Sequence, residues 1–514
     1  MLLFGPAIAG ADVPVRVVRF NDVKPAGVQL DTTFEGVGLD PQERVYGYLC
    51  GNGSDDCHLV RWNPKTGKRE YLGSFGAAAK RDGNLGPNQY WPKEEKIVKG
   101  HTHVWYLDGK MWVGTMNAHD YKDMSVIRGG HLMAYNLATG IITDHSQWQP
   151  KGIFKDRGGF YAIPVYPPKN VIVGIGVPNS SPAGGCELII YNPRTRQTKH
   201  VPGLPHGTDN GQLAARDAAI TPDGKVLYQC GPANTTFKAY SPASGNRTSL
   251  RFAVALATRT CVCRNEGNKP STFGMYNLKT GVNKATNFKT QEVLTTSIEL
   301  TSNGKKAYVT DLKNIYEFNL QTGTQRTLTT LDPAGTPRQS TGAILSRDEK
   351  KLYYIINMVD VKDSAFINDL YEYNIETGVR TKLKNLRNVL GGGAKVSGSH
   401  GTASNGKIYF VFRPSSNAGI IEIDVSSRTG PKPNRTPADP VCGNNICESG
   451  ETETNPSCRL AAAATADGQM TFARISSLCR TYTCRAATSG IAISAGSRQT
   501  RQPLRSRPAV ALAG

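Results

Sequence analysis

Histidine side chains gather in one short part of this 514-residue chain. Four of its nine histidines, His101, His103, His119 and His131, fall within 31 residues. An imidazole can transfer a proton near neutral pH, ligate a divalent metal, or form hydrogen bonds inside a core. The chemistry open to this segment is therefore acid–base catalysis, metal binding or structural hydrogen bonding.

The residues around these histidines predict strands that would position them. The run H-T-H-V-W-Y-L-D-G-K-M-W-V-G-T-M has a hairpin pattern with an Asp-Gly turn. Because side chains alternate along a strand, His101, His103 and Trp105 should share one face. His119 should follow the returning strand, and His131 should begin the next strand. Strand ends of this kind can bring several histidines to one opening.

A metal site at the cluster is one of the alternatives. Its ligands would be His101 and His103, with His119 or Asp120 as the third. The chain contains no H-E-x-x-H motif and no pair of C-x-x-C motifs, so neither a zincin helix nor a zinc ribbon is predicted. We expect no required cofactor, with a structural divalent metal as the open alternative.

A short phrase recurs along the chain and indicates the scaffold. It is a strand end, then Asn or a similar residue, then Thr-Gly, and it usually follows a turn such as T-P-D-G-K. Units of four short antiparallel strands, repeated at about 40–60 residues, are typical of a β-propeller. The copies have their aromatic or aliphatic residue at Trp62, Tyr135, Tyr191, Tyr240, Tyr276, Phe318, Tyr373 and Ile423.

The spacing of the copies sets the expected number of blades. Only 36 residues separate Tyr240 from Tyr276, which is short for a blade. We therefore expect an all-β fold with a seven-bladed β-propeller, and eight blades as the alternative. An α/β fold is not predicted, because strands follow strands without helical patterns between them. The expected parts are an N-terminal leader or extended segment (1–30), the propeller (31–428), a Pro-rich linker (429–440), a Cys-rich module (441–458) and a disordered or spurious tail (459–514).

Charge and cysteine content bear on partners and compartment. The net charge of +20 favours polyanionic partners, although the tail from Arg459 onward contributes eight arginines and one acidic residue. Cysteines at close spacings around turns suit disulfides, whose pairing stays open, and this indicates a secreted protein. The start, M-L-L-F-G-P-A-I-A-G-A, has a short apolar run without a basic region. We expect a monomer that binds an acidic polysaccharide, with no nucleic acid and no membrane span.

Two resemblances carry more specific expectations. The run "VCGNNICESGETETNPSC" resembles the CGNGICE-type Cys-rich repeats of extracellular proteins. The runs "GHTH", "AHDYKD", "RGGHLMAYNLATG" and "GLPHGTDNGQLAARDAAITPDGKVLY" resemble the ulvan lyases, which are secreted propellers that cleave polysaccharides. The likeness covers roughly Gly36 to Tyr228. It implies β-elimination beside a uronic acid, although Arg157 and Gly158 stand where the family's His-Gln-Gly is expected.

The ulvan lyase resemblance also implies roles for particular residues. His103 or His101, together with His119, would act as acid and base, and Tyr161 would be a further proton-transfer group. Arg216 would pair with the substrate carboxylate, unless it forms an ordinary ion pair with Asp217 or with a neighbouring blade. The residues expected to contact the substrate are Tyr121, Lys122, Arg128, His131 and His206.

A different class of function also fits the sequence. A non-catalytic extracellular propeller that binds carbohydrate or protein would have the same repeats, and a Cys-rich module would suit adhesion. Propellers host many functions, so the fold does not decide between the two. Convergence of the histidines and Arg216 at one opening would favour the enzyme.

Overall fold

The computed structural model describes the segments of the chain that form its strands and helices. Every described residue belongs to the unit Met1–Asp439. The described residues are 13–33, 36–51, 56–85, 96–97, 99–100, 102–116, 130–146, 159–177, 187–202, 217–229, 271–291, 295–311, 313–331, 339–357, 366–413 and 417–433.

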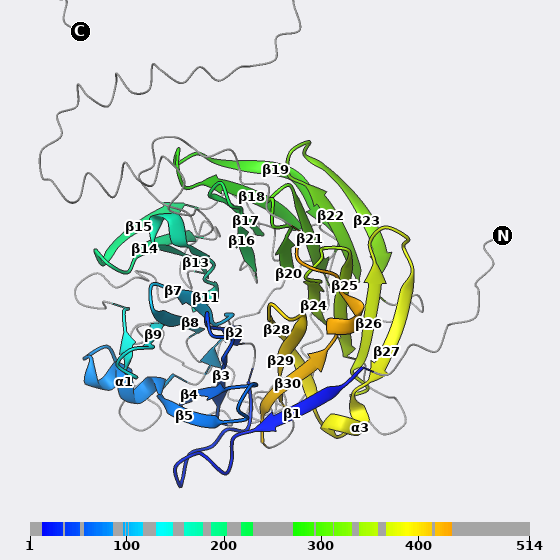
Figure 1. Cartoon of the computed structure of the whole chain (residues 1–514). Coiled ribbons are helices and arrows are strands. Elements are labelled where there is room, and N and C mark those ends of the chain that lie inside the picture. The colour runs from blue at the N-terminus through cyan, green and yellow to red at the C-terminus, as the bar shows by residue number, and fades with distance from the viewer. Residues whose placement is uncertain are drawn as a thin grey trace, which may run out of the picture. The chain divides into compact units, whose positions relative to one another are not determined.

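Seven antiparallel sheets stand as blades around one centre, as Figure 1 shows. In blades 1 to 6 the first strand lies innermost and later strands lie further out. The first four blades are blade 1, β2 (Val37–Leu39), β3 (Val45–Cys50), β4 (Cys57–Trp62) and β5 (Arg69–Ser74); blade 2, β6 (Lys99–Gly100), β7 (Trp105–Leu107), β8 (Lys110–Met116), β9 (Leu132–Asn136) and β10 (Ile142–Asp144); blade 3, β11 (Gly159–Ala162), β12 (Val165–Tyr166), β13 (Val171–Val177), β14 (Glu187–Asn192) and β15 (Gln197–Pro202); and blade 4, β16 (Ala218–Ile220), β17 (Lys225–Gln229), β18 (Ser271–Asn277) and β19 (Asn283–Thr290).

The remaining three blades follow the same plan. They are blade 5, β20 (Thr295–Leu300), β21 (Lys306–Asp311), β22 (Asn314–Asn319) and β23 (Thr324–Thr330); blade 6, β24 (Gln339–Leu345), β25 (Lys351–Asn357), β26 (Asp369–Asn374) and β27 (Arg380–Asn385); and blade 7, β28 (Lys395–Thr402), β29 (Lys407–Arg413) and β30 (Gly419–Asp424), with β1 (Val15–Arg19) as its outermost strand.

The seven-bladed all-β prediction is confirmed, and the structure explains the surplus phrase. Seven of the eight copies lie in the strand next to the outermost strand of a blade. The copy at Tyr240 lies outside the described residues, between β17 and β18 in the sequence. Since β17 pairs directly with β18, blade 4 is complete without it.

The N-terminal boundary of the predicted propeller falls too late. The sequence suggested an extended segment for residues 1–30, whereas β1 pairs with β30 from Val15↔Ile423 to Arg19↔Gly419. The N-terminal strand therefore closes the ring, because it completes a blade whose other strands come from the C-terminal end of the propeller. The predicted linker also begins inside the described structure, where the Gly430 N–H donates to the Asp348 carboxylate over 2.7 Å. The Cys-rich module and the tail lie outside the described residues.

The recurring Asn-x-x-Thr-Gly phrase forms the turn between the third and fourth strands. In blade 6 the Asn374 Oδ1 accepts the backbone N–H groups of Glu376 and Thr377, at 3.0 and 2.9 Å. Gly378 ends the turn with φ +71°, which a glycine adopts without a steric penalty. The side chain of Asn thus holds the turn locally, and Gly supplies its left-handed last residue.

Short helices interrupt the β pattern in places that the sequence did not reveal. Helix α1 (Phe75–Arg81) follows β5 directly, and the Ser74 hydroxyl caps it by accepting the Ala77 N–H over 3.0 Å. The other short elements are α3 (Arg387–Leu390) and the 3-10 turns η1 (Pro167–Lys169) and η2 (Ser426–Arg428). Each of these elements is too short to show a helical periodicity in the sequence.

The strands of each blade give the ring two distinct edges. We call the edge with the short hairpin turns the turn edge; in blade 2 it includes residues 107–110 and 136–142. The opposite edge is the connector edge, where Met116 pairs with Lys99 and where β9 begins. Apolar side chains between adjacent blades form the core, including fully buried Trp62 and Trp112.

Candidate functional site

The structure describes three of the ten residues predicted for the site. His103, Tyr161 and His131 are described. The other seven lie outside the described residues: His101, His119, Tyr121, Lys122, Arg128, His206 and Arg216.

Six of these seven residues, all except His101, belong to two connections between strands. Residues 117–129 connect β8 to β9, and residues 203–216 connect β15 to β16. The described strand ends that flank both connections lie at the connector edge, as the pairing of Pro202 with Glu187 shows for blade 3. Both connections therefore leave and rejoin their blades at the connector edge.

His103 lies where the innermost strand of blade 2 is interrupted. Strand β6 pairs with residues 115–116 of β8 and β7 pairs with residues 110–112, so the intervening residues leave the ladder. The Thr102 hydroxyl fills the gap by accepting the Gly114 N–H over 2.9 Å. His103 is partly exposed, and its ring centroid lies 6.0 Å from that of Trp105. His103 itself lies between β6 and β7, and His101, the third residue predicted for that strand face, lies outside the described residues.

Tyr161 occupies a related position in blade 3. It lies in the innermost strand β11, at a bulge between Phe160 and Ala162, and its side chain is partly exposed. Phe160 instead turns into the contact with blade 2, where a Cβ at Gly114 would approach its side chain. The bulge therefore gives neighbouring residues different directions, as bulges near functional sites often do.

Other innermost strands are interrupted at a similar level, so the interruption belongs to the fold. In blade 6 the register shifts between Ser340 and Ala343, and the Thr341 hydroxyl accepts the Ile355 N–H over 3.1 Å, as Thr102 does in blade 2. The next residue is Gly342 in blade 6 and His103 in blade 2. The interruption thus presents an acid–base side chain where the related blade has only a glycine.

His131 has a different environment from the one predicted. Its side chain is 2% exposed, and its Nδ1 lies 2.6 Å from the Asp144 Oδ2. The Asp144 carboxylate also accepts the Ser146 N–H over 2.8 Å. Although burial opposes ionisation, the adjacent His131 and Ser146 hold the pKa of Asp144 below its ordinary value. Burial removes His131 from any surface that a polysaccharide could contact, and the structural alternative describes it better.

A second buried histidine was not singled out from the sequence. His145 is 5% exposed, packs edge-on against Trp112, and its Nδ1 lies 2.9 Å from the Tyr191 Oη in blade 3. Burial, with the positive charges of Lys110 and Arg196, lowers its pKa from 6.5 to about 4. His145 is therefore neutral at physiological pH and packs in the contact between blades 2 and 3.

Arg216 lies outside the described residues, whereas Asp217, the partner of its alternative ion pair, is described. The neighbouring Asp217 is buried, and its carboxylate accepts the N–H groups of Ala218 at 2.8 Å and Ile298 at 2.7 Å. The second bond links blade 4 to blade 5. Asp217 therefore has a structural role of its own.

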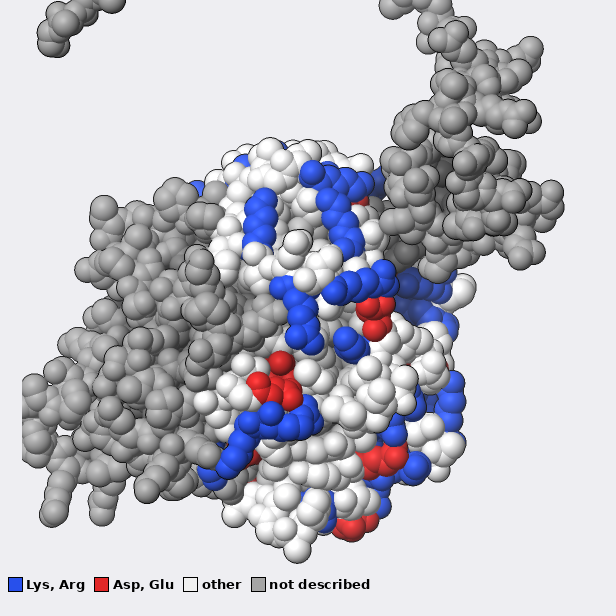
Figure 2. Space-filling view, turned by 90° about the vertical axis from the view of Figure 1, so that its left-hand side faces the viewer, with Lys and Arg blue, Asp and Glu red and all other residues white. Residues whose placement is uncertain are grey.

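Positive side chains are prominent on the side of the ring that carries blades 2 and 3. Figure 2 shows this side, where Lys and Arg outnumber Asp and Glu among the coloured residues. Blade 3 contributes exposed Lys169, Arg194, Arg196 and Lys199, of which Arg194 pairs with Asp108 at 2.6 Å. An open hollow of about 390 Å³ lies beside Lys199 on the outer strands, and no predicted site residue lines it.

The described part of the chain contains no candidate metal site. No group of three His, Cys, Asp or Glu side chains there is arranged to hold a metal ion. Three of the predicted ligands, His101, His119 and Asp120, lie outside it. In the same described segments, no helix has the length and apolar character needed to span a membrane.

Comparisons with known proteins gave only distant structural likenesses. No family model matches the chain, and no curated protein matches its sequence. One similar solved structure is titled "Crystal Structure of Mitotic Checkpoint Complex", with 12% identity over 82% of this chain and 98% of that chain and a TM-score of 0.46. Another is "Oligogalacturonate lyase in complex with manganese", with 10% identity, coverage of 80% and 97%, and a TM-score of 0.43.

Proposed function

We propose that this protein is a secreted propeller that binds a uronate-containing, ulvan-type polysaccharide and cleaves it by β-elimination. The observation that carries the proposal is the placement of His103 and Tyr161. Both side chains are partly exposed: His103 lies between the two innermost strand pieces of blade 2, β6 and β7, and Tyr161 lies at the bulge in β11 of blade 3. The sequence resemblance to ulvan lyases selected these residues for proton transfer.

The proposed reaction assigns each group a defined step. A base, His103 or Tyr161, takes the C5 proton of the uronate. The electron pair of that C–H bond forms the C4–C5 double bond as the C4–O bond breaks, and an acid protonates the departing oxygen. Arg216 would neutralise the uronate carboxylate, because a guanidinium pairs with a carboxylate in bidentate geometry and stays charged. The excess of positive side chains on blade 3 would attract the polyanion.

An activity assay with matched variants tests the proposal. The purified protein is incubated with ulvan and other polyuronates, and ultraviolet absorbance of the conjugated unsaturated product is followed. We expect His103→Gln and Tyr161→Phe each to lower kcat by roughly 10²-fold or more, as loss of an acid–base group does. His200→Gln, on the outer strand β15, is the control and should keep full activity.

Two results would contradict the lyase proposal. One is equal activity of His103→Gln, Tyr161→Phe and His200→Gln. The other is binding of the polysaccharide without product across the whole panel. Binding without product would instead support the non-catalytic carbohydrate-binding propeller, for which the positive side of blade 3 is the supporting observation.

Secretion forms part of the proposal and has its own support. Cys50 and Cys57 form a disulfide whose two residues are fully buried. Such bonds persist in oxidising compartments. We expect a protein made in a reducing cytosol to contain free thiols at these positions, which thiol titration after unfolding would detect.

A further inference from the structure

The segment that carries His103 is held by residues of the preceding blade. The Tyr48 hydroxyl, from β3 of blade 1, donates to the Thr102 carbonyl over 3.0 Å. The Val104 N–H donates to the Val37 carbonyl over 3.2 Å. These bonds fix the backbone on both sides of His103, at the place where blade 2 itself offers no ladder pairing.

The ring of Tyr48 has little freedom to move. It is fully buried, and it passes between Gly36 and Gly100, where a Cβ on either glycine would overlap the ring. The Tyr48 carbonyl accepts the Thr33 hydroxyl over 3.0 Å, which fixes the backbone of the same residue. Close packing on both ring faces makes the position of the hydroxyl a fixed property of blade 1.

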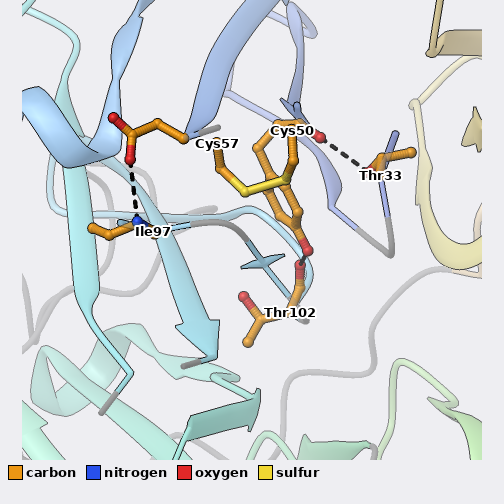
Figure 3. The surroundings of a disulfide bond; sticks show 7 residues. Thr33, Cys50, Cys57, Ile97 and Thr102 are labelled. Atoms are coloured by element: carbon orange, nitrogen blue, oxygen red, sulfur yellow. Dashed lines mark hydrogen bonds between the residues drawn. A yellow bond between two sulfur atoms is a disulfide. The ribbon is translucent and has the colours of Figure 1, made fainter. Parts of the chain in front are cut away.

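A disulfide closes the hairpin that carries Tyr48, as Figure 3 shows. Cys50 ends β3 and Cys57 begins β4, two residues that also pair in the sheet. The Cys57 N–H donates to the Ile97 carbonyl over 2.6 Å, and the Ile97 N–H donates to the Asp56 carboxylate over 3.1 Å. The closed hairpin therefore contacts the chain both before and within the innermost strand of blade 2.

We infer that Tyr48 is a positioning residue for His103 and that the Cys50–Cys57 disulfide braces it. The inference rests on the proposed function for its effect on catalysis. Tyr48 acts through the Thr102 backbone and takes no part in proton transfer. The buried Tyr48 hydroxyl bonds the backbone beside His103, and the disulfide holds the hairpin that carries Tyr48. Together they fix the position of the His103 imidazole.

A paired substitution separates positioning from general stability. Tyr48→Phe removes only the hydroxyl that holds Thr102. Tyr46→Phe is the matched control, because Tyr46 lies on the same strand, is fully buried, and donates to Asp40 within blade 1 over 3.1 Å. The Cys50→Ala/Cys57→Ala double variant tests the brace and serves as a second route if Tyr48→Phe does not fold.

The main measurement is the NMR signal of the His103 imidazole, assigned by its loss in His103→Gln. We expect Tyr48→Phe and the double cysteine variant to shift this signal and its titration midpoint, while Tyr46→Phe leaves both unchanged. Where lyase activity is present, Tyr48→Phe should lower kcat/KM roughly ten- to hundredfold and shift its pH profile.

The outcomes separate the two proposals. An unchanged His103 signal in Tyr48→Phe, or in the double cysteine variant where Tyr48→Phe does not fold, overturns the positioning role, whatever the activity. A shifted signal in a protein that cleaves no polyuronate overturns the lyase proposal and leaves the positioning role standing. An equal shift in Tyr46→Phe would also contradict the inference, because the effect would then be general to blade 1.

Discussion

Replacing Asp144 by Asn tests whether the buried His131–Asp144 pair supports the structure of blade 2. The carboxylate accepts three hydrogen bonds, from the His131 Nδ1 at 2.6 Å, the Ser146 N–H at 2.8 Å and the Ser146 hydroxyl. An Asn of the same shape keeps one acceptor oxygen, and it turns an NH₂ toward donors. Hydrogen bonds to a charged group contribute about 1.5–3 kcal/mol each. We expect the free energy of unfolding to fall by about 3–4 kcal/mol, within the range for breaking a buried pair.

The assay is urea unfolding of wild type, Asp144→Asn and a control in the same blade. Asp108→Asn is suitable, because Asp108 pairs with Arg194 on the surface and has φ +52°, a conformation that Asn also accepts. Exposed pairs contribute little, so this control should lose less than about 1 kcal/mol.

The pH dependence of the Asp144→Asn effect adds a second criterion. A carboxyl with a lowered pKa stabilises the fold above its unfolded value of about 3.9, and that contribution is lost as pH falls through the folded value. The difference between wild type and Asp144→Asn should therefore be constant from pH 7 to about 5 and shrink under more acidic conditions. Equal effects of the two substitutions, or a difference that grows as pH falls, would refute the reasoning.

Three further predictions concern the ring itself. The pKa of His145 is lowered from 6.5 to about 4, so wild type should lose roughly 2–3 kcal/mol of stability as pH falls through this window, and His145→Gln should lose less in a pH series of thermal unfolding. Arg196 has φ +57° in the turn position that glycine fills in other blades, so Arg196→Gly should stabilise the protein by about 1 kcal/mol in urea unfolding. Deleting residues 1–20 removes β1 with buried Val18 and should lower the free energy of unfolding in urea by at least about 3 kcal/mol.

The sequence predicted the ring because its repeated signals are local. The Asn374 side chain accepts the N–H groups of Glu376 and Thr377 in its own turn, and Gly378 supplies the left-handed residue that ends it. A pattern of this kind is complete within a few residues, so it can be read without knowing the neighbours. The strand β1 was missed for the opposite reason, since its partner Ile423 lies about 400 residues away in the sequence.

The sequence predicted less of the site, because burial depends on neighbours in space. It predicted one strand face for His101, His103 and Trp105, whereas His103 lies between β6 and β7, with its ring 6.0 Å from that of Trp105. It could not separate the buried His131 from the partly exposed His103, since the Asp144 that accepts its Nδ1–H comes from the next strand and has no motif of its own. His145 likewise becomes neutral through contacts with Trp112 and with Tyr191 of another blade.

The turn edge and the inner part of the blades differ in which bonds fix their side chains. This difference predicts where substitutions should affect function. At the turn edge, bonds within one turn determine the geometry. At His103, on an innermost strand, the bonds that matter come from the preceding blade, through Tyr48 and Val37. Blade 4 shows the same dependence, because Asp217 receives the Ile298 N–H from blade 5. Substitutions that alter a ligand-binding residue of one blade should therefore often lie in the adjacent blade, at buried positions that touch no ligand.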